Sequence, residues 1–296
     1  MTPLPPRRGM TLIEVLMAVT LLALIGVSLT KLLSSQVRFA DTQIAAKDAR
    51  EVSRASLNAL VTDVRMVDAD SGILTATSDS FTVLAPYAAG VVCGTTTAGT
   101  ASVIALLPYD SVGYTEGGYA GFAYIDMTTS GTAYNQVYQY KYTTVTPGTL
   151  DSTTATTTAP CKTVTDQVNL FRMGAVTVQP LIPVQSRYQA AFLFRKVTYA
   201  FKPSVAISGS RGLFRHVLNG THGDEELVAP FSTSAQFSYL LKDGTTVSSA
   251  VGATLHSIRG IQLQLNGTSE HAVAGATQVE LAPTMTAIFF KNRPKQ

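Results

Sequence analysis

The feature that most constrains this chain is a long apolar segment close to its amino terminus. From Met10 to Thr30 every residue is apolar, small or hydroxylated except one carboxylate, Glu14. As a helix this segment would extend roughly 30 Å, enough to cross the hydrocarbon core of a bilayer. An ionisable group in such a span costs on the order of 2.5–3.5 kcal/mol, which a partner charge or a place at the helix start offsets. The segment therefore predicts a membrane helix in which Glu14 is either an interaction residue or a carboxylate at the helix start.

The helical pattern continues beyond the apolar segment, because neither proline nor glycine occurs from 27 to 71. Apolar residues recur at sums of three- and four-residue steps, at Leu33, Val37, Ile44, Val52, Leu60, Val64 and Val67. Charged residues fill the other faces, at Lys31, Arg38, Lys47, Asp48, Arg50 and Glu51. We predict one helix from about Met10 to about Val67, on the order of 85 Å long, with Gly72 as its stop. Its amphipathic part, residues 31–71, would pack on a globular head.

After residue 72 the chain changes to short β-type segments separated by glycine, proline and threonine clusters. The β-branched and aromatic bias of strands occurs at Phe81–Leu84, Val103–Leu107, Tyr119–Met127, Val137–Val145, Tyr188–Phe201, Leu227–Leu241 and His256–Leu265. Lys242–Gly244 supplies a turn. The predicted fold is thus α+β, with a long N-terminal helix packed on a β-rich head over residues 72–296. The head is long enough for one sizeable unit or two small ones.

Neither the charge nor the residue patterns indicate nucleic-acid binding or catalysis. Charged residues make up 14% of the chain, the net charge is +3, and the basic residues are scattered. The four histidines lack metal-binding spacing, and no nucleophile elbow or phosphate loop occurs. We expect no enzyme activity and no cofactor. The acidic turn at Asp224, Glu225 and Glu226 is a weak candidate for a divalent cation, and a solvated turn explains it as well.

One further pattern in the head is the Asn-Gly-Thr triplet, which begins at Asn219 and again at Asn266. Both triplets are interpreted as glycine-containing turns.

The charges before the apolar segment predict on which side of the membrane the head lies. Arg7 and Arg8 precede the segment and place the first residues in the cytoplasm by the positive-inside tendency, so the head would lie outside. There Cys93 and Cys161 are expected to form a disulfide, worth roughly 4–5 kcal/mol on the chain-entropy model, although two separate thiols are the alternative.

The nonamer Arg7-Arg8-Gly9-Met10-Thr11-Leu12-Ile13-Glu14-Val15 resembles the class III signal of type IV pilins and pseudopilins. The resemblance implies that residues 1–9 are a leader, which a prepilin peptidase removes by cutting between Gly9 and Met10. The same enzyme would methylate Met10, a position where the family most often has phenylalanine. Residues 10–30 would stay attached as the transmembrane and assembly helix. The resemblance also implies that Glu14 neutralises the amino terminus of a neighbouring subunit.

A looser resemblance covers the second half of the head. The order of Val197–Phe201, Gly212–Arg215, Glu226–Ala229, Phe237–Leu240 and Ile258–Leu263 is similar to the head of PilW-type minor pilins and J-type pseudopilins. It implies a minor pilin that enters a type IV pilus or primes its assembly. Alternatives are a J-type pseudopilin of a type II secretion system and a membrane-anchored binding domain or adhesin. The implied partners are pilin or pseudopilin subunits, the prepilin peptidase, the inner-membrane assembly platform and, before assembly, membrane lipid. The implied locations are the inner membrane, crossed once, and then a periplasmic or cell-surface filament.

Overall fold

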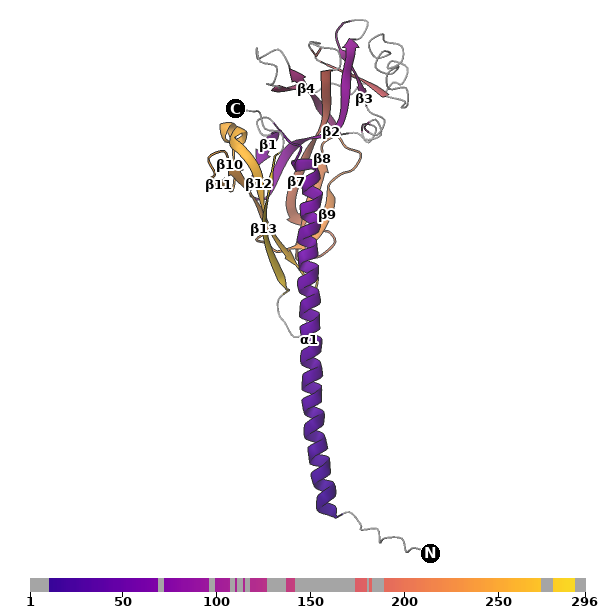
Figure 1. The fold of residues 1–296 in the computed structure, drawn as a ribbon, viewed down its shortest axis with the longest axis vertical. Coiled ribbons are helices and arrows are strands. Elements are labelled where there is room, and N and C mark those ends of the chain that lie inside the picture. The colour runs from indigo at the N-terminus through magenta and orange to yellow at the C-terminus, as the bar shows by residue number, and fades with distance from the viewer. Residues whose placement is uncertain are drawn as a thin grey trace, which may run out of the picture.

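The chain folds into a long helix that carries a β-rich head at its C-terminal end, an α+β architecture (Figure 1). The computed structural model describes residues 11–68, 72–95, 99–106, 110, 114, 118–126, 137–141, 174–179, 181–182, 189–272 and 279–290. The helix, α1, runs from Leu12 to Val64 without a break, and Gly26 lies inside it. The predicted fold class is therefore confirmed.

The helix α1 ends three residues before the predicted boundary. Arg65 is its C-cap, and the Arg65 N–H still donates to the carbonyl of Val61 at 3.1 Å. Gly72, the predicted stop, lies in the turn that follows, where its N–H donates to the Asp68 carbonyl at 2.9 Å. A Cβ at Gly72 would lie 2.5 Å from a methyl carbon of Val67, so this tight turn requires glycine.

The described residues of the head form thirteen strands and one short 3-10 helix. The strands are β1 (Ile73–Ala76), β2 (Ser80–Thr95), β3 (Ser102–Leu106), β4 (Tyr119–Asp126), β5 (Val137–Lys141), β6 (Gly174–Val178), β7 (Gln189–Pro203), β8 (Arg211–Val217), β9 (Glu225–Phe231), β10 (Gln236–Leu241), β11 (Thr246–Val247), β12 (Ile258–Thr268) and β13 (Leu281–Phe289). The 3-10 helix η1 spans Gly252–Ser257. Neighbouring strands follow the order β11-β10-β12-β9-β8-β7-β2-β3-β6, and β1, β4, β5 and β13 pair beside this path.

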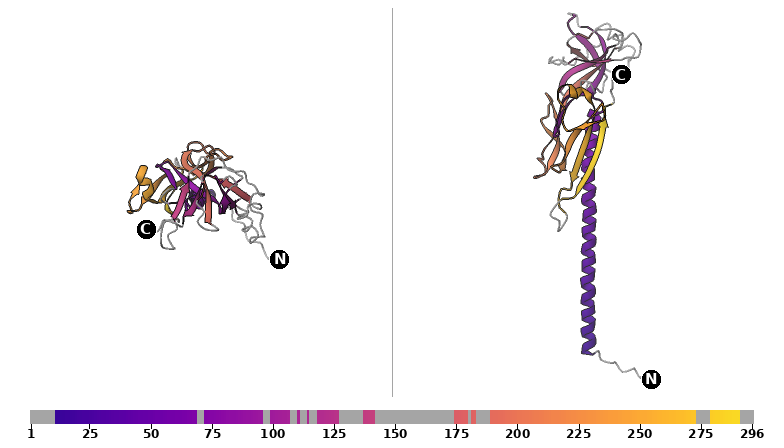
Figure 2. Two further views of the ribbon diagram at one scale, coloured as in Figure 1. Left: turned by 90° about the horizontal axis from the view of Figure 1, so that it is seen from above. Right: turned by 90° about the vertical axis from the view of Figure 1, so that its left-hand side faces the viewer.

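The long strands β2 and β7 connect two tiers of the head. They pair antiparallel along nearly their whole length, from Ser80 opposite Ala200 to Val92 opposite Gln189. The first half of β7 pairs with β4, and its second half pairs with β8. Similarly, β2 pairs first with β1 and then with β3. Because each long strand changes partner midway, the β2–β7 ladder belongs to two parts of the head. These are a proximal tier beside α1 and a distal tier beyond the end of α1 (Figures 1 and 2).

Each tier has its own hydrophobic core. The proximal core joins the last turns of α1 to the sheet, with Leu60 and Val64 packed among buried side chains that include Tyr199, Phe237 and Ile261. The distal core lies between β2, β3, β4, β6 and β7, with the fully buried Ile104, Leu106, Phe122, Val176, Val178 and Leu193 among its members. The described head is therefore one continuous sheet with a core in each tier, and a third, smaller cluster joins Leu84, Ala123 and Phe194.

Several strand and turn predictions in the head needed correction. The strand at Phe81–Leu84 continues to Thr95, because Pro86 coincides with a register shift in the ladder, a place where proline is tolerated. The extended segment Leu227–Leu241 is divided into β9 and β10 by a turn closed by the Ala235 N–H and the Ser232 carbonyl. Asn266 lies buried inside β12 rather than in a turn.

The first of the two Asn-Gly-Thr triplets does form a turn. Asn219 has φ of 58°, the left-handed region that asparagine tolerates better than most residues. The N–H of Gly220 donates to the Val217 carbonyl at 3.0 Å and closes the turn. The same three letters therefore occupy a turn at one site and a strand at the other. The difference lies in the neighbouring strand. β12 continues through Asn266 because β13 pairs with it there, with Pro283 opposite Asn266.

The buried face of α1 matches the predicted apolar stripe only toward the end of the helix. The stripe residues Leu33, Val37 and Ile44 are all more than half exposed. The residues that α1 buries are Ala45, Ala49, Ser53, Ser56, Leu60 and Val64. Small side chains dominate this face because the helix approaches the backbone of β12 closely. Toward the end of α1 the predicted stripe is confirmed: Leu60 and Val64 are fully buried in the proximal core, and Val52, Leu57 and Val61 pack against it partly buried.

Candidate functional site

The start of α1 carries the residue that the sequence singled out, Glu14. Thr11 is the N-cap, with an extended backbone, and its Oγ1 accepts a hydrogen bond from the Glu14 N–H at 3.4 Å. The Glu14 Oε2 accepts in return from the Thr11 N–H and from the Thr11 hydroxyl, both at 3.1 Å. This reciprocal capping box satisfies backbone donors that the first turn leaves open. It also places a negative charge at the positive end of the helix dipole.

The N-terminal part of α1 is uncovered. From Leu12 to Phe39 its large apolar side chains are between 44% and 85% exposed. We call this segment the arm. It projects away from the head in both side views (Figures 1 and 2). Its length and composition suffice to cross a membrane, and the most apolar stretch of α1 has no buried residue. An uncovered apolar surface of this size marks a contact with lipid or protein.

Hydroxyl groups in the arm bond to the arm's own backbone. The Oγ atoms of Ser28 and Ser34 donate to the carbonyls four residues earlier at 2.8 Å, and the Thr30 hydroxyl does the same. Thr20 donates to the Met17 carbonyl at 2.9 Å. Transfer of a hydroxyl group into an apolar environment costs little free energy when the group is already hydrogen-bonded within the helix. Between Leu12 and Thr30, Glu14 is thus the one ionisable side chain that an apolar environment must accommodate.

The arm is fixed to the head by a close contact between α1 and β12. A Cβ at Gly267 would lie 2.2 Å from the carbonyl oxygen of Ala49 and 2.8 Å from the Ser53 hydroxyl. Such distances leave room for no side chain at Gly267. The Ser53 hydroxyl donates back to the Ala49 carbonyl at 3.4 Å, so this polar pair is satisfied within the helix. The contact lets helix and sheet pack at backbone distance.

A second contact ties the end of α1 to the sheet through charge. Asp63 Oδ2 accepts from the Tyr199 hydroxyl at 2.6 Å and from Arg215, whose Nε and Nη2 lie at 3.3 Å and 3.2 Å. Tyr199 is fully buried between the strands. Burial, and then the Asp63 charge, raise the pKa of Tyr199 far above its ordinary value, so the phenol remains a donor. Helix, β7 and β8 thereby share one hydrogen-bonded cluster.

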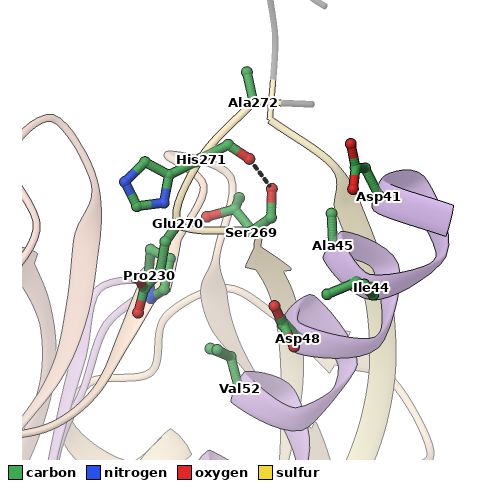
Figure 3. A pocket seen from close by; sticks show the side chains of 11 residues that line it. Asp41, Ile44, Ala45, Asp48, Val52, Pro230, Ser269, Glu270, His271 and Ala272 are labelled. Carbon is green, nitrogen blue, oxygen red and sulfur yellow. Dashed lines mark hydrogen bonds between the residues drawn. The ribbon is translucent and has the colours of Figure 1, made fainter. Parts of the chain in front are cut away.

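A groove of about 310 Å³ lies between α1 and the end of β12 (Figure 3). Its floor is formed by Ala45, Val52 and Pro230, and its rim carries Asp41, Asp48 and Glu270. The Ser269 hydroxyl donates to the His271 carbonyl at 2.8 Å and shapes the edge of the groove. Asp41 and Asp48 come from α1 just above the arm, whereas Glu270 comes from the sheet. The groove is therefore acidic.

A comparison with known proteins identifies a motif at the start of the chain. Residues 4–30 match the model of the prokaryotic N-terminal methylation motif. The chain carries a prepilin-type signal. This signal, followed by an apolar helix that is uncovered in the structure, supports a type IV pilin-like or pseudopilin-like protein that is anchored in a membrane. No curated protein and no solved structure matches the chain.

Of the residues predicted to act at this signal, Glu14 lies in the described part, in the capping box. Gly9 and Met10 lie outside the described residues. The capping box itself was missed. Its signature, a threonine followed three residues later by glutamate at the start of an apolar run, is present in the sequence as Thr11 and Glu14. The prediction had started the helix at Met10, one residue before the true N-cap.

The predicted acidic turn is divided between different partners. Asp224 forms an ion pair with Lys202, and its Oδ1 lies 3.0 Å from Nδ1 of His216. The Lys202 contact is the main cause that lowers the pKa of Asp224 below its ordinary value. Glu226 accepts from the N–H groups of Val205 and Ala206 at 2.9 Å and 3.1 Å.

No metal-binding group of three acidic, histidine or cysteine side chains occurs among the residues that the structure describes. Glu225 is exposed at the start of β9. The predicted disulfide concerns Cys93 and Cys161. Cys93 belongs to β2, and Cys161 lies outside the described residues. The disulfide therefore stays a prediction.

Proposed function

We propose that this chain is a PilW-type minor pilin that enters a type IV pilus or primes its assembly. The observation that carries the proposal is the uncovered arm of α1 directly after a prepilin-type signal. An uncovered apolar helix is unstable in water, and two environments cover it: a bilayer before assembly and neighbouring helices in a filament. The head then lies outside the cytoplasm and is carried by the rigid continuation of the same helix.

The proposed order of events begins with the prepilin peptidase, which cuts after Gly9 and methylates the new amino group of Met10. The cut places a positive charge one residue before the N-cap Thr11, at the end of the helix dipole that disfavours cations. A carboxylate nearby offsets this charge. Glu14 supplies it, both within its own chain and, as we propose, to the amino terminus of a neighbouring subunit.

The geometry of the capping box is compatible with this second role. Both side-chain hydrogen bonds of Glu14 in the described structure use Oε2. Oε1 can therefore accept from a neighbour while Oε2 keeps the cap. Moving a paired carboxylate and ammonium into an apolar filament core costs less desolvation free energy per charge than moving either charge alone. Pairing between residues four apart would also shift neighbouring helices axially by about 6 Å.

The proposal is tested at the amino terminus and in the filament. Mass spectrometry of the protein from membranes should give a chain that begins with methylated Met10, whereas an intact Met1 start would favour a membrane-anchored binding domain. Glu14→Ala should reduce the amount of the protein that co-purifies with filaments but leave its amount in the membrane unchanged. Co-purification of Glu14→Ala at the wild-type level would contradict the assembly role. Deletion should abolish twitching; loss of enzyme export instead would identify a J-type pseudopilin.

A further inference from the structure

One side of α1 carries basic residues that the head leaves uncovered. Lys47, Arg50 and Arg54 are all exposed. Lys47 lies 3.6 Å from Glu51, an exposed pair that contributes little. Arg50 and Arg54 take part in no ion pair within the described part of the chain. We call Lys47, Arg50 and Arg54 the basic face.

The acidic groove lies on another side of the same helix. At 3.6 residues per turn, the basic face is rotated by roughly 100–160° around α1 from Asp48. The rim carboxylates Asp41, Asp48 and Glu270 likewise form no ion pair among the described residues. Arg50 and Arg54 on one side of α1, and the groove carboxylates on another, have no ion-pair partner among the described residues and cannot meet within one molecule. They are arranged for contact between successive copies in a row.

We propose that the basic face of one copy of this chain docks against the acidic groove of a second copy. The occupant is a second copy because the chain itself carries both complementary surfaces. The inference rests on the proposed function, since it takes the axial shift from the pairing of Glu14 with a neighbour's Met10 amino group. The contact is heterologous, so it repeats along a filament rather than closing a pair.

The axial positions of the two surfaces support this contact. A shift of four residues, about 6 Å, sets residue 47 of one helix level with residue 43 of the next, and residue 50 level with residue 46. Both levels fall between Asp41 and Asp48, the two groove residues that α1 supplies. The register that pairs the amino termini therefore also brings the charged faces to the same height. Arg65 lies on the same side of α1, but its level falls well above the groove.

A zero-length cross-link tests the contact in the full-length protein. Two differently tagged copies of Arg50→Lys are expressed together, and the membranes are treated with a carbodiimide, which joins an amine to a carboxylate that it contacts. We expect at least a threefold increase in dimers that carry both tags, with residue 50 linked to Asp41, Asp48 or Glu270. The matched control is Arg65→Lys, which adds the same amine outside the groove and should leave the yield at the wild-type level. Equal yields from the two variants would overturn the proposal.

Charge reversal provides the second arm of the test. Arg50→Glu with Arg54→Glu should reduce cross-linked dimers at least fivefold, and adding Asp41→Lys with Asp48→Lys to the same chain should restore them. Failure of this restoration, with the protein present in the membrane at normal level, would refute the contact. A chain that enters filaments without the cross-link refutes the contact and leaves the proposed function standing. A chain that cross-links but never enters filaments refutes the proposed function alone.

Discussion

Gly267 lies directly against Ala49, so that the backbone of β12 touches the backbone of α1. A Cβ at Gly267 would come within 2.2 Å of the Ala49 carbonyl oxygen, a distance that side chains do not adopt. This contact lies close to the level at which the arm leaves the head, because α1 is uncovered up to Phe39 and buries side chains from Ala45 onward. The direction of the arm relative to the head thus depends on the absence of one side chain.

Gly267→Ala should separate helix and strand. The backbone oxygen of Ala49 cannot move without breaking its own helical hydrogen bonds, so the added methyl group overpacks the contact at a cost of about 1–3 kcal/mol. Urea unfolding of the detergent-solubilised full-length protein measures the loss. The matched control is Gly223→Ala, since a Cβ there meets nothing within 4 Å and should change stability by less than about 0.5 kcal/mol. Equal stability of the two variants would show that the contact does not constrain the helix.

The cluster of Asp63, Tyr199 and Arg215 allows a second prediction. Tyr199→Phe removes a donor to a carboxylate and should lower the free energy of unfolding by about 1.5–3 kcal/mol. The same substitution in an Asp63→Ala background should cost much less, because its partner is already gone. A double-mutant cycle gives the coupling free energy. Additive effects of the two substitutions would mean that Tyr199 stabilises the fold through packing alone.

Alkaline pH should destabilise the head through its buried tyrosines. Burial is the main cause that raises the pKa values of Tyr199 and Tyr239 far above their ordinary value near 10. A raised folded-state pKa means that the unfolded chain loses its phenol protons first, so stability is complete below about pH 10 and declines above it. Unfolding free energies measured between pH 8 and pH 11 should show this decline. Tyr239→Phe should make the decline shallower, and an unchanged slope would exclude this tyrosine as a cause.

The two cores should respond separately to mutation. Ile104 is buried in the distal core and Ile261 in the proximal core, each with no exposed surface. Substituting either with alanine should cost about 2–5 kcal/mol locally. Hydrogen exchange should show that Ile104→Ala weakens protection in β3 and β6 but not along β12, and that Ile261→Ala does the reverse. Loss of protection throughout the head in both variants would show that the tiers unfold as one unit.

Local patterns predicted the elements of this fold better than their packing. The uninterrupted helix follows from the absence of proline and glycine between 27 and 71, and many of the strands follow from the β-branched and aromatic segments. The strands β6 and β13 lie outside every predicted segment. The apolar stripe from Leu33 to Val67 predicts packing on the head, because apolar residues at helical spacing commonly face a core. Its members Leu60, Val64 and Val67 are buried, whereas Leu33, Val37 and Ile44 are exposed and the helix reaches β12 through Ala49 and Ser53.

Leu33 and Val37 are exposed because they lie in the arm, outside the part of α1 that the head covers, and Ala49 is buried because a distant glycine, Gly267, packs against it. Nothing near Ala49 in the sequence announces that Gly267 will approach it. The cluster around Asp63 was unpredictable for the same reason, since Tyr199 and Arg215 follow it by 136 and 152 residues. By contrast, the capping box lies within four residues and was open to prediction from the sequence.

The two roles of Glu14, as a cap and as a charge, should be separable by substitution. Glu14→Gln keeps an oxygen that can accept from Thr11, since glutamine also completes a capping box, but it removes the charge. Thr11→Val removes the capping hydroxyl and keeps the charge, at a cost of about 1 kcal/mol to the helix start. Hydrogen exchange at the amides of residues 13–15 in micelles should therefore increase in Thr11→Val and stay near the wild-type level in Glu14→Gln.

Incorporation into filaments should show the opposite order. If the charge of Glu14 neutralises a neighbour's amino terminus, Glu14→Gln enters filaments poorly although its helix start is intact. Thr11→Val enters them at close to the wild-type level, because lateral packing in the filament stabilises a frayed first turn. Thr11→Ser, which keeps the hydroxyl, is the matched control for both measurements. Normal incorporation of Glu14→Gln together with poor incorporation of Thr11→Val would reverse the argument and make the carboxylate a structural cap whose charge has no part in assembly.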